Sequence, residues 1–204
     1  MNLSLLKKIL PGLVPPFRFI LLKTRLMNRR YKNEEWFPVV NNEGKVTGKA
    51  PRSVCHDGKS FLLHPVVHLH IFNLSGKLYL QKRATTKDIQ PGKWDTSVGG
   101  HISPGETVTD ALYRETREEL GLNGFAPQFL GKYIWESSHE RELVSTFCIT
   151  TDESPEINRD EIDEGRFWSE QEIKDNLGKD IFTPNFEHEF GMIISTPFFL
   201  PPAI

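Results

Sequence analysis

The sequence predicts an α+β fold in which a mixed β-sheet is flanked by helices in α/β/α layers, with an extra β-hairpin at the N-terminal side. Three observations predict it. Short apolar segments separated by turn residues fill most of the chain before residue 100. A segment with helical periodicity follows and stops at Gly121, and a second long hairpin and two capped helices come after it. A chain of 204 residues is long enough for one domain with a substantial core.

Two hairpins and a short strand make up the first part of the predicted domain. Residues 36–40 and 45–50 flank an Asn-Asn-Glu-Gly turn, and residues 65–72 and 77–83 flank an Asn-Leu-Ser-Gly turn. A Pro-Gly turn then leads into a short strand at residues 94–98. We expect these strands to form the sheet on which the following segment is mounted.

A turn and a helix follow. The run from Gly99 to Gly105 is rich in turn residues, and a helix is predicted from Glu106 to Leu120 because Gly121 is a good residue for a helix C-terminus. At roughly 100° per residue, one face of this helix begins as an ordinary apolar stripe of Val108, Ala111 and Leu112.

The second half of the chain supplies a long hairpin, a strand and two helices. The hairpin is predicted at residues 128–136 and 142–150, and the strand at residues 166–168. Ser169 and Glu172 form a capping-box pattern, and Thr183-Pro184 starts the last helix. The residues predicted to pack in the hairpin are Phe129, Lys132, Ile134, Trp135, Leu143, Phe147 and Ile149.

Residues 1–33 differ from the domain predicted over residues 34–204. They contain eight Lys or Arg residues and no acidic residue. One interpretation is a short amphipathic helix that makes weak contact with an anionic membrane. The others are a nonspecific basic tail, or a translation start at Met27 that makes the first 26 residues an artefact.

Charge and cysteine content limit the function classes. The net charge of −2 gives no nucleic-acid footprint, so no nucleic-acid partner is expected. Cys55 and Cys148 lie far apart and form no CxxC motif, which is typical of a reduced, cytoplasmic protein. No apolar run approaches the roughly 18 residues of a membrane span.

The apolar helix stripe is interrupted by Glu115, Glu118 and Glu119, at spacings of i, i+3 and i+4. Carboxylates on a face that packs inward repel one another and lose hydration. A bound hard cation relieves both effects, and oxygen ligands favour Mg²⁺ or Mn²⁺ over zinc. The alternative is a solvated acidic helix with the ion pairs Asp110/Arg114 and Arg114/Glu118.

The segment from Gly100 to Leu122 resembles the Nudix box. Its seven fixed polar or glycine positions are occupied by Gly100, Glu106, Arg114, Glu115, Glu118, Glu119 and Gly121. One position departs, because Thr116 stands where the family usually has an aliphatic residue. The resemblance extends over roughly residues 34–190, and it implies the Nudix fold and metal-dependent hydrolysis of a diphosphate linked to a second group.

The resemblance also implies roles for individual residues. Glu118 and Glu119 are expected to be the main metal ligands, with the carbonyl of Gly99 as another. Glu115 is a ligand or the general base. Glu106 and Arg114 are expected to orient the loop and helix through an ion pair. Glu161, in the acidic loop before the last strand, is the expected additional ligand, with Glu164 second and an ordinary acidic surface loop as the alternative.

Residues 64–106 are also similar to isopentenyl-diphosphate isomerases of the same superfamily. This likeness implies that Arg83 and Lys87 hold a diphosphate, and Arg52 is expected to assist them. His64 and His101 match metal-binding histidines of those enzymes, and His56 lies near a third with its spacing off by one. The isomerases need a cysteine just before the Gly-His pair, and this chain has Gly99 there. Hydrolysis is therefore favoured over isomerisation.

Several alternatives stay open from the sequence. The chain is expected to act on a small-molecule diphosphate, but its organic part and the oligomeric state are not determined. A non-catalytic ligand-binding module is a further alternative, which the intact box glutamates disfavour. His68 and His70 alternate on one strand and either form a metal cluster with His64 or are satisfied polar residues facing the cleft.

Overall fold

The computed structural model describes residues 31–194 and 196–199. Contacts divide the chain between Glu35 and Trp36, and the description below concerns the unit that starts at Trp36. The membrane-contact and translation-start hypotheses for residues 1–33 therefore lie almost entirely outside the described residues. Within those residues, no helix has both the length and the hydropathy needed to span a bilayer.

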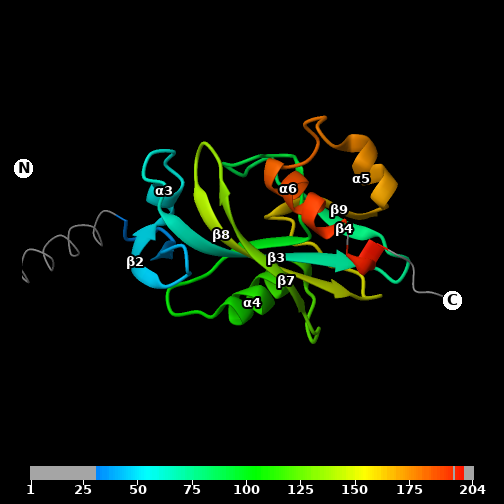
Figure 1. Ribbon diagram of the computed structural model, residues 1–204, viewed down its shortest axis with the longest axis horizontal. Coiled ribbons are helices and arrows are strands. Elements are labelled where there is room, and N and C mark those ends of the chain that lie inside the picture. The colour runs from blue at the N-terminus through cyan, green and yellow to red at the C-terminus, as the bar shows by residue number, and fades with distance from the viewer. Residues whose placement is uncertain (1–30, 195, 200–204) are drawn as a thin grey trace, which may run out of the picture. The chain divides into compact units, whose positions relative to one another are not determined.

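The predicted α+β fold is confirmed as a mixed sheet between helices (Figure 1), with a separate N-terminal hairpin. The hairpin pairs β1 (Trp36–Val40) with β2 (Val46–Pro51), and the short helix α3 (Arg52–Cys55) follows it. The central sheet has the order β5-β4-β3-β8-β7, with β6 on β3 and β9 on β4. Its strands are β3 (Leu63–Phe72), β4 (Leu78–Arg83), β5 (Trp94–Asp95), β6 (Val98–His101), β7 (Gln128–Glu136), β8 (Arg141–Thr150) and β9 (Ile162–Trp168).

Strand β3 lies at the centre, parallel to β8 and antiparallel to β6. Alternate side chains of a strand point to opposite faces of the sheet. Val67, Leu69 and Ile71 belong to the core cluster under α4 (Val108–Leu120). Phe72 points to the opposite face and belongs to a second core cluster, which includes residues of α6 (Pro184–Ile193). Figure 1 shows α4 on one side of the sheet and α6 with α5 (Glu170–Asn176) on the other.

Helix α4 ends at Leu120 as the sequence predicts, but it starts at Val108, two residues after the predicted Glu106, because Thr107 is the N-cap. The Thr107 side chain accepts a hydrogen bond from the Asp110 N–H, and Gly121 ends the helix in the left-handed conformation with φ of 68°. Thr116, the departure from the family pattern, is fully buried and donates its hydroxyl to the Leu112 carbonyl at 2.7 Å. The threonine therefore packs like the aliphatic residue it replaces.

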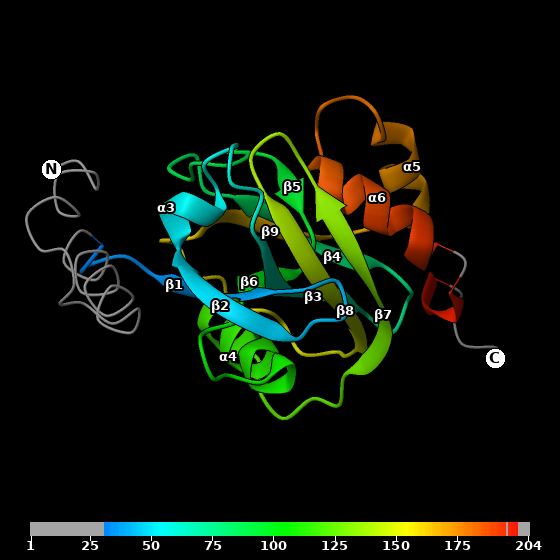
Figure 2. The ribbon, with the colours of Figure 1, turned by 60° about the vertical axis from the view of Figure 1, so that its left-hand side comes forward.

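The other helix starts also follow the sequence. Ser169 and Glu172 form both hydrogen bonds of a capping box at α5, and Thr183 caps α6 with Pro184 at its first turn. Figure 2 shows these two helices beside each other on the face of the sheet that lies opposite α4.

Two expectations were wrong. Gly99 and Gly100 lie in strand β6 rather than in a turn, because they pair with His68 and Val67 of β3. Phe129, Lys132 and Ile134 were expected to pack, but Lys132 is exposed, and Phe129 and Ile134 are 55% and 37% exposed. All three lie on β7, an edge strand of the sheet that pairs with β8.

Candidate active site

Three of the predicted acidic residues meet between α4 and the loop before β9. Glu119 is 6% exposed and accepts a hydrogen bond from Gln81 Nε2 at 2.9 Å. Burial, and then the charge of Glu115, raises the pKa of Glu119 to about 8, and Glu161 acts in the same direction. Glu119 is thus a buried carboxylate beside the partly exposed Glu115 and Glu161, and a hard cation stabilises such an arrangement.

Glu118 is placed differently. Its side chain is 53% exposed and its carboxylate lies 3.2 Å from Arg114 Nη1. The structure thus brings Glu115, Glu119 and Glu161 together and leaves Glu118 at the solvent edge of the same helix.

Arg114 connects the loop after β6 to the helix. Its Nε and Nη2 donate to the two carboxylate oxygens of Glu106 at 2.8 and 2.9 Å, and Nη2 also donates to the His101 carbonyl. Its Nη1 pairs with Glu115 at 2.8 Å. Gly100 packs directly on the Glu115 side chain, so that a Cβ at this position would collide with it.

The predicted phosphate-binding cations all have partners in the structure. Lys87 Nζ lies 2.6 Å from Glu161 Oε2, and Arg83 Nη1 donates to Asp95 Oδ2 at 3.0 Å. Arg52 Nη1 lies 3.4 Å from His101 Nδ1. An anionic ligand would have to exchange with these partners or add to them.

A second group of ligand-type residues lies on the face of the sheet opposite α4. His56, His64, His101 and Glu142 place one ligand atom each within 4.8 Å of one another. The Nε2 atoms of His56 and His64 are 3.3 Å apart, and those of His56 and His101 are 3.2 Å apart. Glu140 lies 3.4 Å from His56. The Phe37 ring stacks on His101 at 4.0 Å and covers the group from the N-terminal hairpin.

The electrostatics of this group suit a metal ion. Burial lowers the pKa of His56 to about 3 and that of His64 to about 4, and it holds the pKa of His101 well below its usual value. The three imidazoles are therefore neutral at physiological pH, which is the metal-binding form. Burial, and then the charge of Glu140, raises the pKa of Glu142 to about 8.

Sequence reasoning found part of this group and missed the rest. It matched His64 and His101 to metal ligands and placed His56 near them, but it did not single out Glu140 or Glu142. The available signal was the Glu-x-Glu spacing at the start of β8, which puts both carboxylates on one face of the strand. It also missed Glu189, whose carboxylate lies 2.9 Å from His68 Nδ1 and 3.2 Å from His70 Nε2. His68 and His70 are thus partners of Glu189, while His64 lies with His56 and His101.

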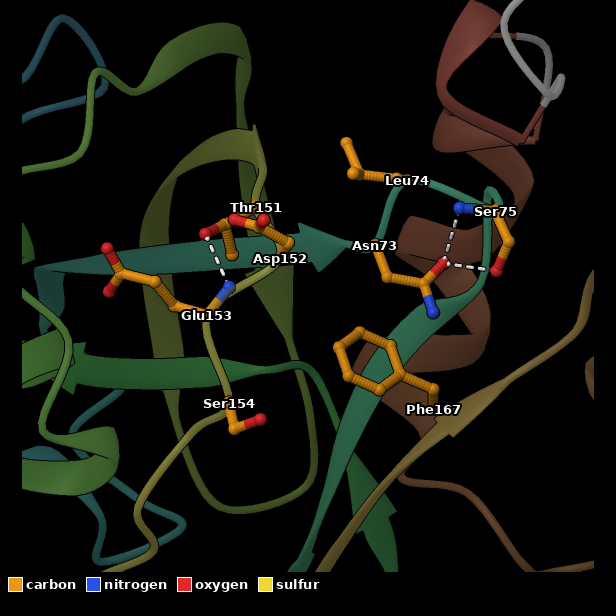
Figure 3. A pocket seen from close by; sticks show the side chains of 8 residues that line it. All are labelled: Asn73, Leu74, Ser75, Thr151, Asp152, Glu153, Ser154 and Phe167. Carbon is orange, nitrogen blue, oxygen red and sulfur yellow. Dashed lines mark hydrogen bonds between the residues drawn. The ribbon is translucent and has the colours of Figure 1, made fainter.

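The pockets at the far end of the sheet are separate from both groups. The one in Figure 3 is lined by the turn after β3 and the segment after β8, with Asn73, Ser75, Glu153 and Phe167 among its residues. It contains none of the predicted site residues.

Comparison with known proteins decides the family. The model of the NUDIX domain matches residues 62–186, which include the box helix and both groups of ligand-type residues apart from His56. The chain belongs to the Nudix family.

Individual relatives agree with the family. The chain is 30% identical over 144 residues to isopentenyl-diphosphate Delta-isomerase 1 of Photorhabdus laumondii, covering 67% of this chain and 82% of the relative. It is 29% identical over 157 residues to the Nudix hydrolase YfcD of Escherichia coli K12, covering 77% and 85%. The DR0079 crystal structure from Deinococcus radiodurans superposes with a TM-score of 0.65 at 21% identity, covering 76% of this chain and 96% of that one. The chain is accordingly an enzyme of the Nudix pyrophosphohydrolase type.

Proposed function

We propose that this Nudix enzyme is a metal-dependent hydrolase that cleaves the diphosphate linkage of a nucleoside or other organic diphosphate by attack of water on phosphorus. The observation that carries the proposal is the buried Glu119 carboxylate, which faces the charges of Glu115 and Glu161. Among the described residues, Gln81 is its hydrogen-bond partner and no cation forms an ion pair with it. A cationic ligand would compensate this excess of negative charge.

Oxygen donors fit Mg²⁺ or Mn²⁺ at this position. Glu119 and Glu115 would hold the cation, Glu161 and the Gly99 carbonyl would complete the set, and Glu118 would join by turning away from Arg114. When bound, such a cation polarises the phosphoryl group and lowers the pKa of a bound water. A Glu115 carboxylate that does not bind the metal would accept the proton of the attacking water.

The basic residues would bind the diphosphate. Lys87 already lies against Glu161, so a phosphate oxygen beside this cation would take the place of a carboxylate contact. Arg83 donates to Asp95 and Arg52 lies beside His101, and phosphate oxygens would replace or join these partners. The Glu106–Arg114 pair would act as a brace that holds the loop after β6 against α4.

In this proposal residues 34–204 form the catalytic domain, and residues 1–33 are a basic extension for which weak membrane contact, a nonspecific tail and a translation artefact all stay open. The two buried free cysteines fit a reducing compartment such as the cytoplasm. The partner is a small-molecule diphosphate.

A second candidate function is isomerisation of an isopentenyl-type diphosphate. Two observations favour it. A second metal centre would fit the group formed by His56, His64, His101 and Glu142. The Photorhabdus relative is named as an isomerase. Gly99 disfavours it, because this position carries no thiol for proton transfer.

Turnover against a panel of diphosphates tests the proposal. The panel contains nucleoside triphosphates, ADP-ribose, NADH, nucleotide sugars, thiamine diphosphate and isopentenyl diphosphate, each with Mg²⁺ or Mn²⁺. We expect phosphate or phosphomonoester release from one class, lost by about 100-fold or more in Glu119→Gln. The matched control is Glu153→Gln, an exposed carboxylate outside both groups. Conversion of isopentenyl diphosphate to its isomer without phosphate release would contradict hydrolysis and support the second candidate.

A further inference from the structure

Strand β7 is an open edge of the central sheet. It is nine residues long, it contains no proline, and among the described strands it pairs with β8 alone. Figure 2 shows it as the outermost strand on its side of the sheet, with α6 beside it. Such an edge presents unpaired N–H and C=O groups, and proteins usually block it with a short strand, a proline, a bulge or charged side chains. The edge of β7 is therefore either blocked or paired with a partner.

A bulge blocks only the first part of this edge. The register between β7 and β8 shifts between Phe129 and Gly131, which bends the strand at that point. From Gly131 to Glu136 each residue of β7 pairs with the next residue of β8 without interruption. The second part of β7 is therefore regular enough to accept another strand.

The backbone groups that point away from β8 belong to alternate residues of β7. The Ser137 N–H donates to the Glu140 carbonyl at 3.0 Å, which makes these two residues a hydrogen-bonded pair. Hydrogen-bonded and non-hydrogen-bonded pairs alternate along an antiparallel ladder. The N–H and C=O groups of Lys132, Ile134 and Glu136 consequently point outward, toward the open edge.

The two charged residues of this stretch make the edge complementary to itself. When a second copy of β7 pairs antiparallel with Ile134 opposite Ile134, Lys132 lies opposite Glu136 of the second copy, and Glu136 opposite its Lys132. Tyr133 then lies opposite Trp135, and about six backbone hydrogen bonds join the outward-pointing groups. Opposite charges and aromatic pairs directly across two strands are stabilising.

Other registers lack this match. Centring the pair on Lys132 or on Glu136 places like charges face to face, which is destabilising. Centring it on Tyr133 or Trp135 places a charged residue opposite Ile134. Both charged side chains are available for the pairing, because Lys132 is exposed and the side chain of Glu136 is 61% exposed beside Arg141.

The helix beside the edge also permits a second copy to approach. The His188 ring of α6 lies 5.0 Å from that of Tyr133 and 5.6 Å from that of Trp135. At helical spacing, His188 belongs to an exposed stripe of α6 without Asp, Glu, Lys or Arg, made of Pro184, His188, Gly191 and Met192. A Cβ added at Gly191 would have no neighbour within 4 Å. A two-fold axis through the paired edges puts both α6 helices on the same face of the joined sheet, where these stripes carry no repelling carboxylates or lysines.

We propose that residues 131–137 are an interface for a second copy of this chain, formed by antiparallel pairing of the two β7 strands around Ile134. Lys132 and Glu136 set the register of this pairing. The pairing joins the two central sheets into one continuous sheet and removes the open edge of both. The inference concerns the assembly of the chain and does not depend on the proposed hydrolase function.

Sedimentation velocity of the full chain, over a dilution series up to about 100 μM, tests the interface. We expect the wild type to form dimers. Ile134→Lys places two lysines opposite each other on the two-fold axis and should raise the dimer dissociation constant by about 100-fold or more. The matched control is Leu74→Lys, which also replaces an exposed apolar side chain. Leu74 follows β3 at the end of the sheet opposite to Glu136, so this variant should remain a dimer.

Charge reversal tests the register. Lys132→Glu and Glu136→Lys each place like charges opposite each other and should each raise the dissociation constant by about 10-fold or more. The variant that carries both changes restores opposite charges only when Ile134 lies opposite Ile134, and its dissociation constant should return to within about 3-fold of the wild type. Loss of the Glu136–Arg141 ion pair cannot explain this rescue, because the single Glu136 variant and the double variant both lack it.

Three results would overturn the inference. A wild type that stays monomeric throughout the series shows that the edge is blocked or is covered by a strand of another kind. A dimer that persists unchanged in Ile134→Lys uses another surface. A double variant no closer to the wild type than the single variants excludes the register. Melting temperatures verify that the variants fold, and if Ile134→Lys does not fold, the charge-reversal variants decide, since both side chains are exposed.

Discussion

The two faces of strand β6 present opposite chemistry one residue apart. Gly100 faces α4 and contacts Glu115, where carboxylates gather around one arginine. Gly99 faces the side of α6 and contacts His68, where histidines and carboxylates alternate. On the α4 face, burial and like charges raise the pKa of Glu119. On the other face, burial keeps His56, His64 and His101 neutral while the pKa of His68 is raised.

This difference shows how one sheet can separate two tasks. Oxygen donors in excess suit a hard cation and the chemistry of a diphosphate. Neutral imidazoles suit a softer metal ion. The absence of a side chain at both glycines lets each set approach the backbone of β6.

The largest expected effect comes from adding one methyl group to the α4 face. In Gly100→Ala the new Cβ collides with the middle of the Glu115 side chain, which must move away from Arg114 and from Glu119. We expect kcat to fall by about 100-fold on every substrate, measured by phosphate release. Gly99→Ala is the comparison and should cost less, because its new methyl group meets His68 and Thr96 at an ordinary contact distance of 3.6 Å. Equal losses in the two variants would show that the faces are not separate.

Metal binding on the histidine face should be measurable without turnover. Co²⁺ at about 100 times its dissociation constant should stabilise the wild type by about 2.7 kcal/mol, seen as a higher melting temperature. His64→Asn should lose this response, since His64 Nε2 lies between His56 and Glu142. Glu119→Gln should retain it. A response that survives in His64→Asn and disappears in Glu119→Gln would place the ion on the α4 face.

The His68–Glu189 pair predicts how stability depends on pH. The pKa of His68 is raised from 6.5 to about 9, so its contribution is complete below pH 6.5 and is lost as the pH rises to about 9. The pKa of Glu189 is lowered from 4.5, because the charges of His68 and His70 outweigh its burial, so its contribution is lost as the pH falls below 4.5. The pair should stabilise most between pH 4.5 and 6.5. The difference in unfolding free energy between the wild type and Glu189→Gln, measured with urea, should therefore shrink from pH 6.5 to 9. A difference that grows over this range would contradict the assignment.

The smallest expected effect concerns the departure from the family pattern. Thr116→Val removes a buried hydroxyl that donates to the Leu112 carbonyl of the same helix turn and puts a methyl group in its place. We expect a change in unfolding free energy within about 1 kcal/mol and unchanged kcat. A large loss of activity would mean that Thr116 has a role in the site beyond packing.

The sequence predicts local structure well because local rules govern it. The cap at Thr183, the capping box at Ser169 and the helix end at Gly121 all depend on neighbours within a few residues. The helical period likewise indicates that the box glutamates share a face. Gly99 and Gly100 were misassigned to a turn because their strand pairing depends on β3, which lies some 30 positions earlier in the chain.

The histidine face was harder to predict because its members come from distant segments. His56 follows α3, His64 and His68 lie on β3, Glu142 lies on β8 and Glu189 lies on α6. No spacing along the chain links these residues, since their approach depends on the order of strands in the sheet and on the packing of α6. A parallel pairing of β3 with β8 alone brings Glu142 beside His64.

The most direct test of the account is the fate of an oxygen from water. Hydrolysis of the best panel substrate in H₂¹⁸O with Mg²⁺, followed by mass spectrometry of the products, shows which bond water attacks. Metal-dependent attack of water on phosphorus predicts one ¹⁸O atom in a phosphoryl product, dependence on the metal, and loss of the labelled product in Glu119→Gln. Product that forms without ¹⁸O in any phosphoryl group, or at an equal rate in Glu119→Gln, would contradict it.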